Sequence, residues 1–294
     1  MWGIWSKTAG RHFVIPMQIE NSMRTGARGN GAPGALWREL HDSLRNPEFW
    51  ALSSWLDILV RARRSRLGFL WLLIPSIVYV FGIGAFFHGM QVSGLGVYFA
   101  HVALGAAVFR SLMSSIIGSA NVFHTSHSFI MDGRMRLTDY VLESLAKSFF
   151  DLCMYLPVVV VALIWFGSVS PVGVLLSLLA LLVLYINGLW IATVFALTGA
   201  RFPDFGQLLN TVSIFLFLLT PIIWYPDQVA AGSLRAKLML INPFYHFIEL
   251  FRAPIMGRTV ELVSLWYVGV MTVVGLVVAT FLYRRYARYV PLWI

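Results

Sequence analysis

Long apolar segments almost free of charge recur through this chain, and they constrain its fold more than any other feature. The hydrocarbon core of a bilayer is about 30 Å thick, and a helix needs about 20 apolar residues to cross it. Only the second and third segments hold a charged residue, Arg110 and Asp151 respectively. The pattern predicts an all-α integral membrane fold with six transmembrane helices, at residues 67–87, 97–117, 149–167, 172–197, 208–224 and 263–283.

Composition supports lipid exposure of these segments. Only 12% of the 294 residues are charged and 59% are hydrophobic, whereas a soluble domain usually carries about 25% charged residues. The apolar excess must therefore face lipid. Pro75, Pro157 and Pro221 fall inside the predicted spans, and we expect a local kink at each, which lipid tolerates better than water does.

Lysine and arginine placement predicts the orientation of the chain, because cytoplasmic loops carry an excess of both. Seventeen of them flank one side of the predicted spans, four flank the other, and Arg110 lies within a span. Both termini are therefore expected on the cytoplasmic side. The pI of about 10.0 reflects this bias, and because the basic residues adjoin membrane spans we expect no nucleic-acid partner.

The residues before the first span divide into two regions. Residues 1–46 are expected to be a flexible cytoplasmic region, and residues 47–66 an amphipathic interfacial helix, followed by the transmembrane domain at 67–294. Pro47 suits a helix start, with Asn46 as a possible cap. The helix could be a simple anchor, or it could dock a cytoplasmic partner or a lipid phosphate through its arginines.

Two connections between spans are unusual. The inner loop at 118–147 concentrates charge around Asp132, which suits either a solvated face or a contact surface for another subunit. The outer loop at 225–261 contains apolar residues at helical spacing after Asn242 and Pro243, where Glu249 and Arg252 can pair weakly. This run is predicted to be a short helix that enters the outer leaflet packed on protein, or else an interfacial cap.

Chemistry-bearing residues are sparse within the predicted spans. Arg110 is the best functional candidate, because a charge at that depth is costly and normally faces a partner or a water-filled path; pairing with Asp151 is the structural alternative. His101 is more often a hydrogen-bonded structural residue in such a position. No phosphate-binding loop, catalytic constellation or metal-ligand array is present in the sequence. This favours transport, with energy supplied by another subunit.

Several segments together resemble the ABC-2 type permeases that export bacterial polysaccharides, and especially the O-antigen branch. Residues 241–257, INPFYHFIELFRAPIMG, give the most specific match, and residues 289–294, YVPLWI, share it. The other matching segments are WLDILVRARRSRLGFLW at 55–71, ARFPDF at 200–205 and TPIIW at 220–224. The resemblance covers about residues 48–294, with departures from the common pattern at Ala62, Phe69 and Pro203.

The resemblance implies a bacterial inner-membrane permease that forms a homodimer and pairs with a cytoplasmic ATPase dimer. It would move an undecaprenyl-pyrophosphate-linked O-antigen, binding no cofactor itself, with ATP and magnesium held by the ATPase. The residues that would couple to the ATPase are Asp57, Asp132, Arg134, Arg136, Asp139 and Glu143. Those at the lipid-pyrophosphate interface would be Arg61, Arg63, Arg64 and Arg66. The translocation path would include Trp71, His101 and Arg110, and an outer gate Phe244, Tyr245, Phe247, Phe251 and Arg252.

Other functions stay open on the sequence alone. Within the family, capsular polysaccharide or teichoic acid could replace O-antigen as the cargo. An ion-coupled or drug transporter working alone would need ionisable groups near mid-membrane, and only His101, Arg110 and Asp151 qualify. An intramembrane glycosyl or acyl transferase would need a catalytic set that the sequence does not offer.

Overall fold

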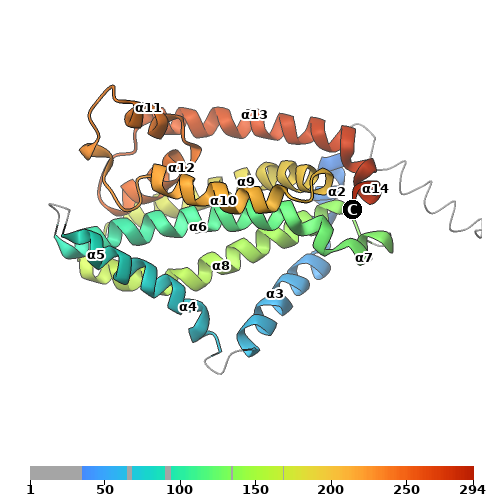
Figure 1. Ribbon diagram of the computed structural model, residues 1–294, viewed down its shortest axis with the longest axis horizontal. Helices are drawn as coiled ribbons and strands as arrows, with labels where there is room; N and C mark the ends of the chain where they lie inside the picture. The colour runs from blue at the N-terminus through green and yellow to red at the C-terminus, as the bar shows by residue number, and fades with distance from the viewer. Residues whose placement is uncertain (1–34, 65–67, 90–93, 134, 168) are drawn as a thin grey trace, which may run out of the picture.

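The computed structural model describes residues 35–64, 68–89, 94–133, 135–167 and 169–294, and the described residues form helices and connections without any strand. Two helices precede the first span, α2 (Ala35–Arg45) and α3 (Glu48–Arg63). Figure 1 shows the long helices running side by side, with α7 and the C-terminus at one end of the molecule and α5 and α11 at the other. The remaining elements are α4 (Leu70–Ile77), a π-helix (Val78–Ile83), α5 (Gly84–His88), α6 (Leu95–Thr125), α7 (His127–Met131), α8 (Leu137–Phe166), α9 (Pro171–Arg201), α10 (Phe205–Leu219), η2 (Pro226–Gln228), α11 (Leu234–Ile241), α12 (Pro243–Ile255), α13 (Leu262–Tyr286), η3 (Ala287–Tyr289) and α14 (Val290–Trp293).

Five helical stretches of the described chain are long and apolar enough to cross a membrane. They correspond to the predicted first, second, third, fourth and sixth spans. The predicted fifth span forms α10, which has 15 residues and is about 22 Å long at 1.5 Å per residue. Six complete crossings therefore remain a prediction, as does the orientation.

The three prolines behave differently from one another. Pro75 lies inside α4, shortly before a π-helix begins at Val78. The wider turns of this π-helix separate α4 from α5 within one continuous helical span. Pro157 lies within α8, which continues past it. Pro221 lies beyond the end of α10 rather than inside the span, so the kink expected there is not formed, because the helix has already ended.

Helix α6 forms the centre of the bundle. It is buried over 78% of its most apolar stretch, against 17% for the span built from α4, the π-helix and α5. It packs against α8, α9 and α12, and small residues allow the close approach. A Cβ on Gly199 of α9 would lie 1.8 Å from the carbonyl oxygen of Ala120 on α6, so only glycine fits there.

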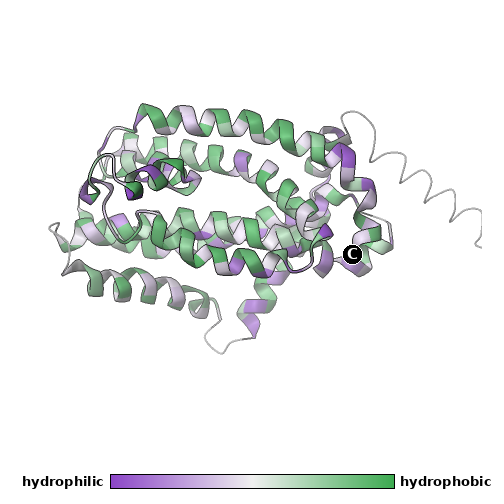
Figure 2. Ribbon diagram, turned by 45° about the horizontal axis from the view of Figure 1, so that its top comes forward, coloured by the Kyte–Doolittle hydropathy of each residue, from purple (hydrophilic) through white to green (hydrophobic). Residues whose placement is uncertain are grey.

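Helix α13 presents an apolar stripe that the other described helices do not cover. Its outward side chains include Trp266, Val270, Val273, Val277 and Phe281, each more than half exposed. Figure 2 shows long hydrophobic stretches along the spanning helices, with hydrophilic residues gathered toward their ends. This distribution is the one expected of a chain whose long helices face lipid.

The N-terminal helix α2 was not anticipated within the region expected to be flexible, of which residues 1–34 lie outside the described part. It packs on α8 and α13 at the end that carries α7 and α14. The Tyr283 hydroxyl donates to Glu39 at 2.5 Å, and Ser43 bonds Thr138 at 2.8 Å. Burial raises the pKa of the Glu39 carboxyl above its ordinary value. These bonds join α2 to two spanning helices.

Helix α3 begins as predicted after Pro47, although the cap is different. Asn46 donates its side-chain amide to the carbonyl of Asp42, closing the end of α2, and makes no cap for α3. Ser54, Ile58 and Ala62 form the buried face of α3 against α8, while Leu52 and Leu56 are exposed. The exposed apolar side chains agree with an interfacial helix.

Candidate functional site

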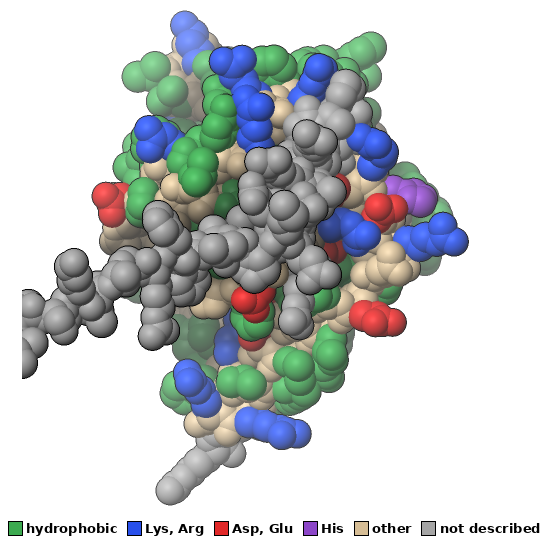
Figure 3. All heavy atoms as spheres, turned by 90° about the vertical axis from the view of Figure 1, so that its right-hand side faces the viewer, with side chains coloured by type: hydrophobic (Ala, Val, Ile, Leu, Met, Phe, Trp, Pro, Cys, Tyr) green, Lys and Arg blue, Asp and Glu red, His purple; other side chains and the backbone are tan. Residues whose placement is uncertain are grey.

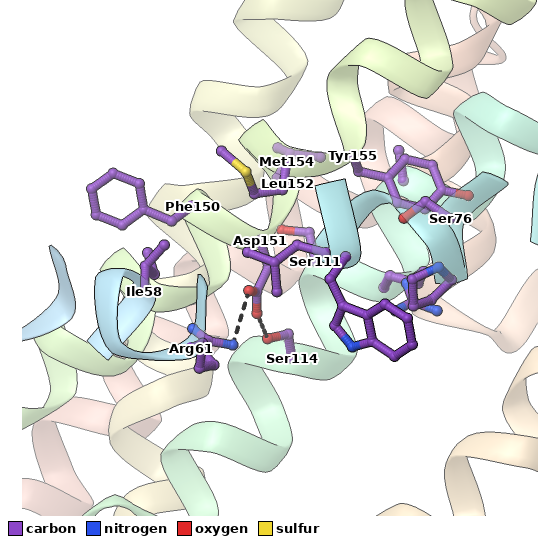
Figure 4. Close-up of a pocket in the computed structure, with 15 residues that line it drawn as sticks. Ile58, Arg61, Ser76, Ser111, Ser114, Phe150, Asp151, Leu152, Met154 and Tyr155 are labelled. Carbon is purple, nitrogen blue, oxygen red and sulfur yellow. Dashed lines mark hydrogen bonds and ion pairs between the residues drawn. The ribbon is translucent and has the colours of Figure 1, made fainter. Parts of the chain in front are cut away.

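A partly open cavity of about 350 Å³ lies where α3 and α4 meet α6 and α8. Figure 4 shows residues from these elements converging on it, with Asp151 facing both Arg61 and Ser114. Arg110 and Asp151 stand near the midpoints of the 31-residue α6 and the 30-residue α8. The cavity therefore places charged groups well inside two long packed helices of the bundle.

Asp151 has two polar partners in this cavity. Its Oδ1 lies 3.4 Å from Nη1 of Arg61, and its Oδ2 accepts a hydrogen bond of 2.8 Å from the Ser114 hydroxyl. The side chains of Arg61 and Asp151 are 46% and 41% exposed, so their attraction is weakened by solvent. The partner considered from the sequence was Arg110, and that pairing is wrong.

Arg110 takes part in no ion pair among the described residues and is exposed toward the cavity. Its guanidinium lies 5.9 Å from the ring centroid of Tyr155, within the range of a cation–π contact. Tyr155 is 3% exposed, yet its hydroxyl has no hydrogen-bond partner among the described residues. Trp71 completes the wall from α4 and is 55% exposed. The cavity thus holds two arginines against one carboxylate and an unused hydroxyl.

The other described arginines of the predicted pyrophosphate interface lie apart from the cavity. Arg63 and Arg64 are exposed at the end of α3, and neither lines the cavity. Arg66 lies outside the described residues, as does Arg134 of the inner loop. Sequence reasoning selected Arg61, Arg110 and Trp71 but missed Ser114 and Tyr155, because a serine or tyrosine in an apolar helix gives no signal of its own.

A second charge cluster surrounds Arg252 on α12, and it is fully enclosed. Arg252 is 0% exposed; its Nη2 lies 3.1 Å from Oε2 of Glu249. Its Nη1 donates to the carbonyl of Pro221 at 2.8 Å and to Nε2 of His101 at 3.2 Å. From the sequence, Glu249 and Arg252 were expected to pair weakly, whereas the structure buries the pair and joins it to His101 and Pro221.

Helix α12 is buried on every side rather than along one face. All residues from Phe244 to Ile255 are buried between α6, α9 and α13. A short helix that enters a bilayer without crossing it must be covered by protein, because its terminal backbone groups would otherwise face lipid. Phe244, Tyr245, Phe247 and Phe251, expected at an outer gate, are therefore packed inside the protein. His101 lies with them and bonds to Arg252. This agrees with the interpretation of His101 as a hydrogen-bonded structural residue.

The predicted ATPase-coupling residues separate into buried and exposed groups. Asp139 and Glu143 are 3% and 5% exposed. The Asp139 carboxylate accepts the backbone N–H of Arg136 at the start of α8. Glu143 pairs with Lys147 at 2.7 Å, and Lys147 also reaches Asp57 at 2.5 Å. The bond from Lys147 to Asp57 ties α3 to α8, whereas the other two lie within α8 and at its start.

The surface near α7 carries the exposed members of the set. Asp132 is exposed, and Arg136 lies 3.7 Å from Asp42 of α2. Phe129 and Met131 are 61% and 58% exposed. They belong to α7, which follows α6 and precedes α8 in the chain and lies at the end of the bundle (Figure 1). Figure 3 views this end, where basic and acidic side chains mix with hydrophobic ones. Sequence reasoning missed Phe129 and Met131.

Nothing in the described residues forms a metal site, since no group of three His, Cys, Asp or Glu side chains gathers there. His124, which the sequence places near His127, instead reaches the carbonyl of Gly199 at 3.0 Å and joins α6 to α9. The cavity at Arg61 offers cationic and hydroxyl donors. Such a set suits an anion rather than a cation.

Comparison with known proteins identifies the class. The chain matches the ABC-2 type transporter family over residues 47–256, and it belongs to that family. The matched region runs from α3 through α12, so it contains both charge clusters. Membrane proteins of this family are permeases, and ATP hydrolysis takes place on a separate subunit in such systems.

A curated relative adds a more specific likeness. The chain is 22% identical over 240 residues to the capsule polysaccharide export inner-membrane protein CtrC of Neisseria meningitidis serogroup A / serotype 4A. The alignment covers 79% of this chain and 88% of that protein. The similarity therefore extends over nearly the whole relative.

Proposed function

We propose that this chain is the membrane subunit of an ATP-driven exporter that moves a lipid-linked polysaccharide across the bacterial inner membrane. The observation that carries the proposal is the cavity at Arg61 and Arg110, an anion-suited site inside a family of export permeases. Undecaprenyl-pyrophosphate-linked O-antigen is the proposed cargo, on the motifs at 241–257 and 289–294. Capsular polysaccharide is the second candidate, favoured by the likeness to CtrC.

The proposed partners are a second copy of the chain and a dimeric ATPase that binds ATP and magnesium. The α7 end is the proposed ATPase contact, since Phe129 and Met131 are exposed there beside Asp132. Exposed aromatic and methionine side chains are frequent anchors in protein interfaces. Asp57 and Glu143 would support that surface through Lys147, which joins α3 to α8. Asp139 would support it through its bond to the backbone of Arg136 at the start of α8.

The aromatic residues of α12 have a proposed role at the outer side. Sugar rings present apolar C–H faces that stack on aromatic rings, so a repeating polymer could slide along them without one tight site. Phe244 and Phe251 are now buried, and α12 would have to shift for them to meet a glycan. The proposal therefore assigns α12 to an outer gate in its closed position.

Purification from native membranes in mild detergent tests this proposal. A stoichiometric subunit with a phosphate-binding loop and ATPase activity is expected, together with lipid-linked glycan whose sugars identify the cargo. Recovery of the chain alone across several detergents, while it still transports when reconstituted alone, would contradict the ATP-driven function.

A pair of variants tests the ATPase contact. Replacing both Phe129 and Met131 by serine is expected to lower the recovered ATPase about tenfold, because interface anchors dominate binding energy. The control is Leu44→Ser on α2, where the side chain is 52% exposed at the same end of the molecule. Equal recovery from both variants would remove α7 from the proposed contact.

A further inference from the structure

The cavity between α3, α4, α6 and α8 carries an unbalanced charge. Arg61 and Arg110 bring two positive charges, and Asp151 supplies the one carboxylate among its lining residues. A net positive site within a bilayer is costly unless an anion or water accompanies it. Tyr155 also lines the cavity, and its buried hydroxyl has no partner among the described residues. The charge imbalance points to an anion as the ligand that this cavity would take.

Two contacts between α3 and α8 lie one helical turn apart and have opposite polarity. In the first, Asp57 of α3 meets Lys147 of α8 at 2.5 Å. In the second, Arg61 of α3 meets Asp151 of α8 at 3.4 Å. The first contact is shorter and is reinforced by Glu143 at 2.7 Å. The second can therefore open while the first keeps α3 on α8.

The contact between Arg61 and Asp151 is also the easier one to exchange. Both side chains are more than two-fifths exposed, so solvent weakens the pair and little is lost when it opens. A phosphate group carries more charge than a carboxylate and presents more acceptor oxygens to a guanidinium. The Ser114 hydroxyl that now donates to Asp151 can rotate to donate to the same anion.

From this geometry we infer that Asp151 is an internal stand-in for a substrate phosphate. A lipid-borne phosphate or pyrophosphate enters the cavity, takes Arg61 and Ser114 from Asp151, and binds Arg110. The volume of about 350 Å³ is near the lower limit of small-ligand pockets, about 300 to 1,000 Å³, and suits a head group rather than a polymer. Asp151 thus holds Arg61 and Ser114 until the phosphate displaces it, and this competition sets the affinity of the site. The inference rests on the proposed function, because it places that cargo's head group here.

Binding measured by calorimetry on the full chain with its co-purified partners tests the site directly. The probe is farnesyl diphosphate; farnesol tests the need for phosphate, and lysophosphatidylglycerol tests phospholipid as the source. Asp151→Asn, which keeps the shape and the bond to Ser114, is expected to bind farnesyl diphosphate about fivefold more tightly, because the competing charge is gone. Arg110→Gln and Arg61→Gln are each expected to weaken binding about tenfold or more.

The matched control is Arg63→Gln, because Arg63 is a neighbouring arginine of α3 that does not line the cavity. It is expected to bind as the wild type does. Equal weakening by Arg63→Gln and Arg61→Gln, or an unchanged affinity in Asp151→Asn, would overturn the inference. Binding of lysophosphatidylglycerol as tight as that of farnesyl diphosphate would support the phosphate site and identify phospholipid as its source.

The failure of this inference can be told apart from failure of the proposed function. If the ATPase co-purifies and export proceeds while all four variants bind the probe like the wild type, the cavity assignment alone is wrong. If the variants behave as expected but no ATPase accompanies the chain and it transports unaided, the phosphate site stands and the ATP-driven function does not.

Discussion

Two arginines within the bundle, Arg252 on α12 and Arg110 on α6, are placed in opposite ways. Arg252 is fully buried, and its guanidinium contacts Glu249, His101 and the carbonyl of Pro221. Arg110 is exposed to a cavity and forms no ion pair among the described residues. Arg252 joins three segments of the chain, whereas the guanidinium of Arg110 is without an ionic partner among the described residues. The pairing of a charge therefore suggests its role, and we expect the paired Arg252 to stabilise the fold and the unpaired Arg110 to bind a ligand.

Substitutions of these charged residues and of their neighbours are expected to differ widely in their effect on the stability of the fold. Arg252→Gln is expected to have the largest effect, because it leaves Glu249 as a buried charge without its partner. Breaking such a pair costs about 3 to 5 kcal/mol. We expect a large fall in the melting temperature of the detergent-purified chain, measured by fluorescence-detected size exclusion. A variant that melts like the wild type and loses only export would show that the cluster serves transport instead.

The double variant Glu249→Leu with Arg252→Met sharpens the same point. Replacing a buried ion pair by apolar side chains of similar volume is often neutral or stabilising. The double variant is therefore expected to recover most of the stability that Arg252→Gln loses, in the same melting assay. A loss as great as that of the single variant would mean that His101 and Pro221, rather than Glu249, require the guanidinium.

Substitutions at the contact between α3 and α8 are expected to have an intermediate effect on stability. Lys147→Gln leaves the Glu143 carboxylate, which is 5% exposed, without its cation, although Ser53 still donates to it at 2.7 Å. We expect a loss of about 1 to 2 kcal/mol. Asp57→Asn serves as the comparison, since Asp57 is 54% exposed and an exposed pair contributes about 0 to 1 kcal/mol. Equal losses in chemical unfolding would contradict this difference in burial.

Arg110→Gln is expected to have the smallest effect on stability and a large effect on export. Removing an unpaired charge from a spanning helix relieves an unfavourable placement, so the melting temperature should not fall. Export of lipid-linked glycan, measured as surface polysaccharide in cells that carry only the variant, is expected to drop about tenfold. A variant that unfolds instead would show that Arg110 is a structural residue like Arg252.

The sequence predicted the bundle more closely than it predicted the site. Uncharged segments of about 20 residues identify spans because the bilayer tolerates few alternatives, and five of the six were found as long helices. Their ends were less predictable. Helices α6 and α8 extend well past the apolar segments at 97–117 and 149–167, because polar residues at 118–147 continue the helices beyond the apolar stretch.

For the candidate site, the sequence singled out the rare charges but not their partners. Arg61, Arg110 and Asp151 stand out in apolar surroundings, so composition alone makes them candidates. That Asp151 meets Arg61 rather than Arg110 depends on how α3 lies across α8, through the buried face of Ser54, Ile58 and Ala62. No local pattern records that crossing.

The sequence by itself determined that the long helices suit a lipid environment, and it determined the number of apolar segments. Both follow from the length and polarity of each segment. What only the tertiary structure decided was the role of each charge. Of two similar arginines in apolar helices, Arg252 became a buried cross-link and Arg110 an exposed group that lines a cavity. Burial and pairing depend on which helices pack together, and packing brings residues from distant parts of the chain into contact.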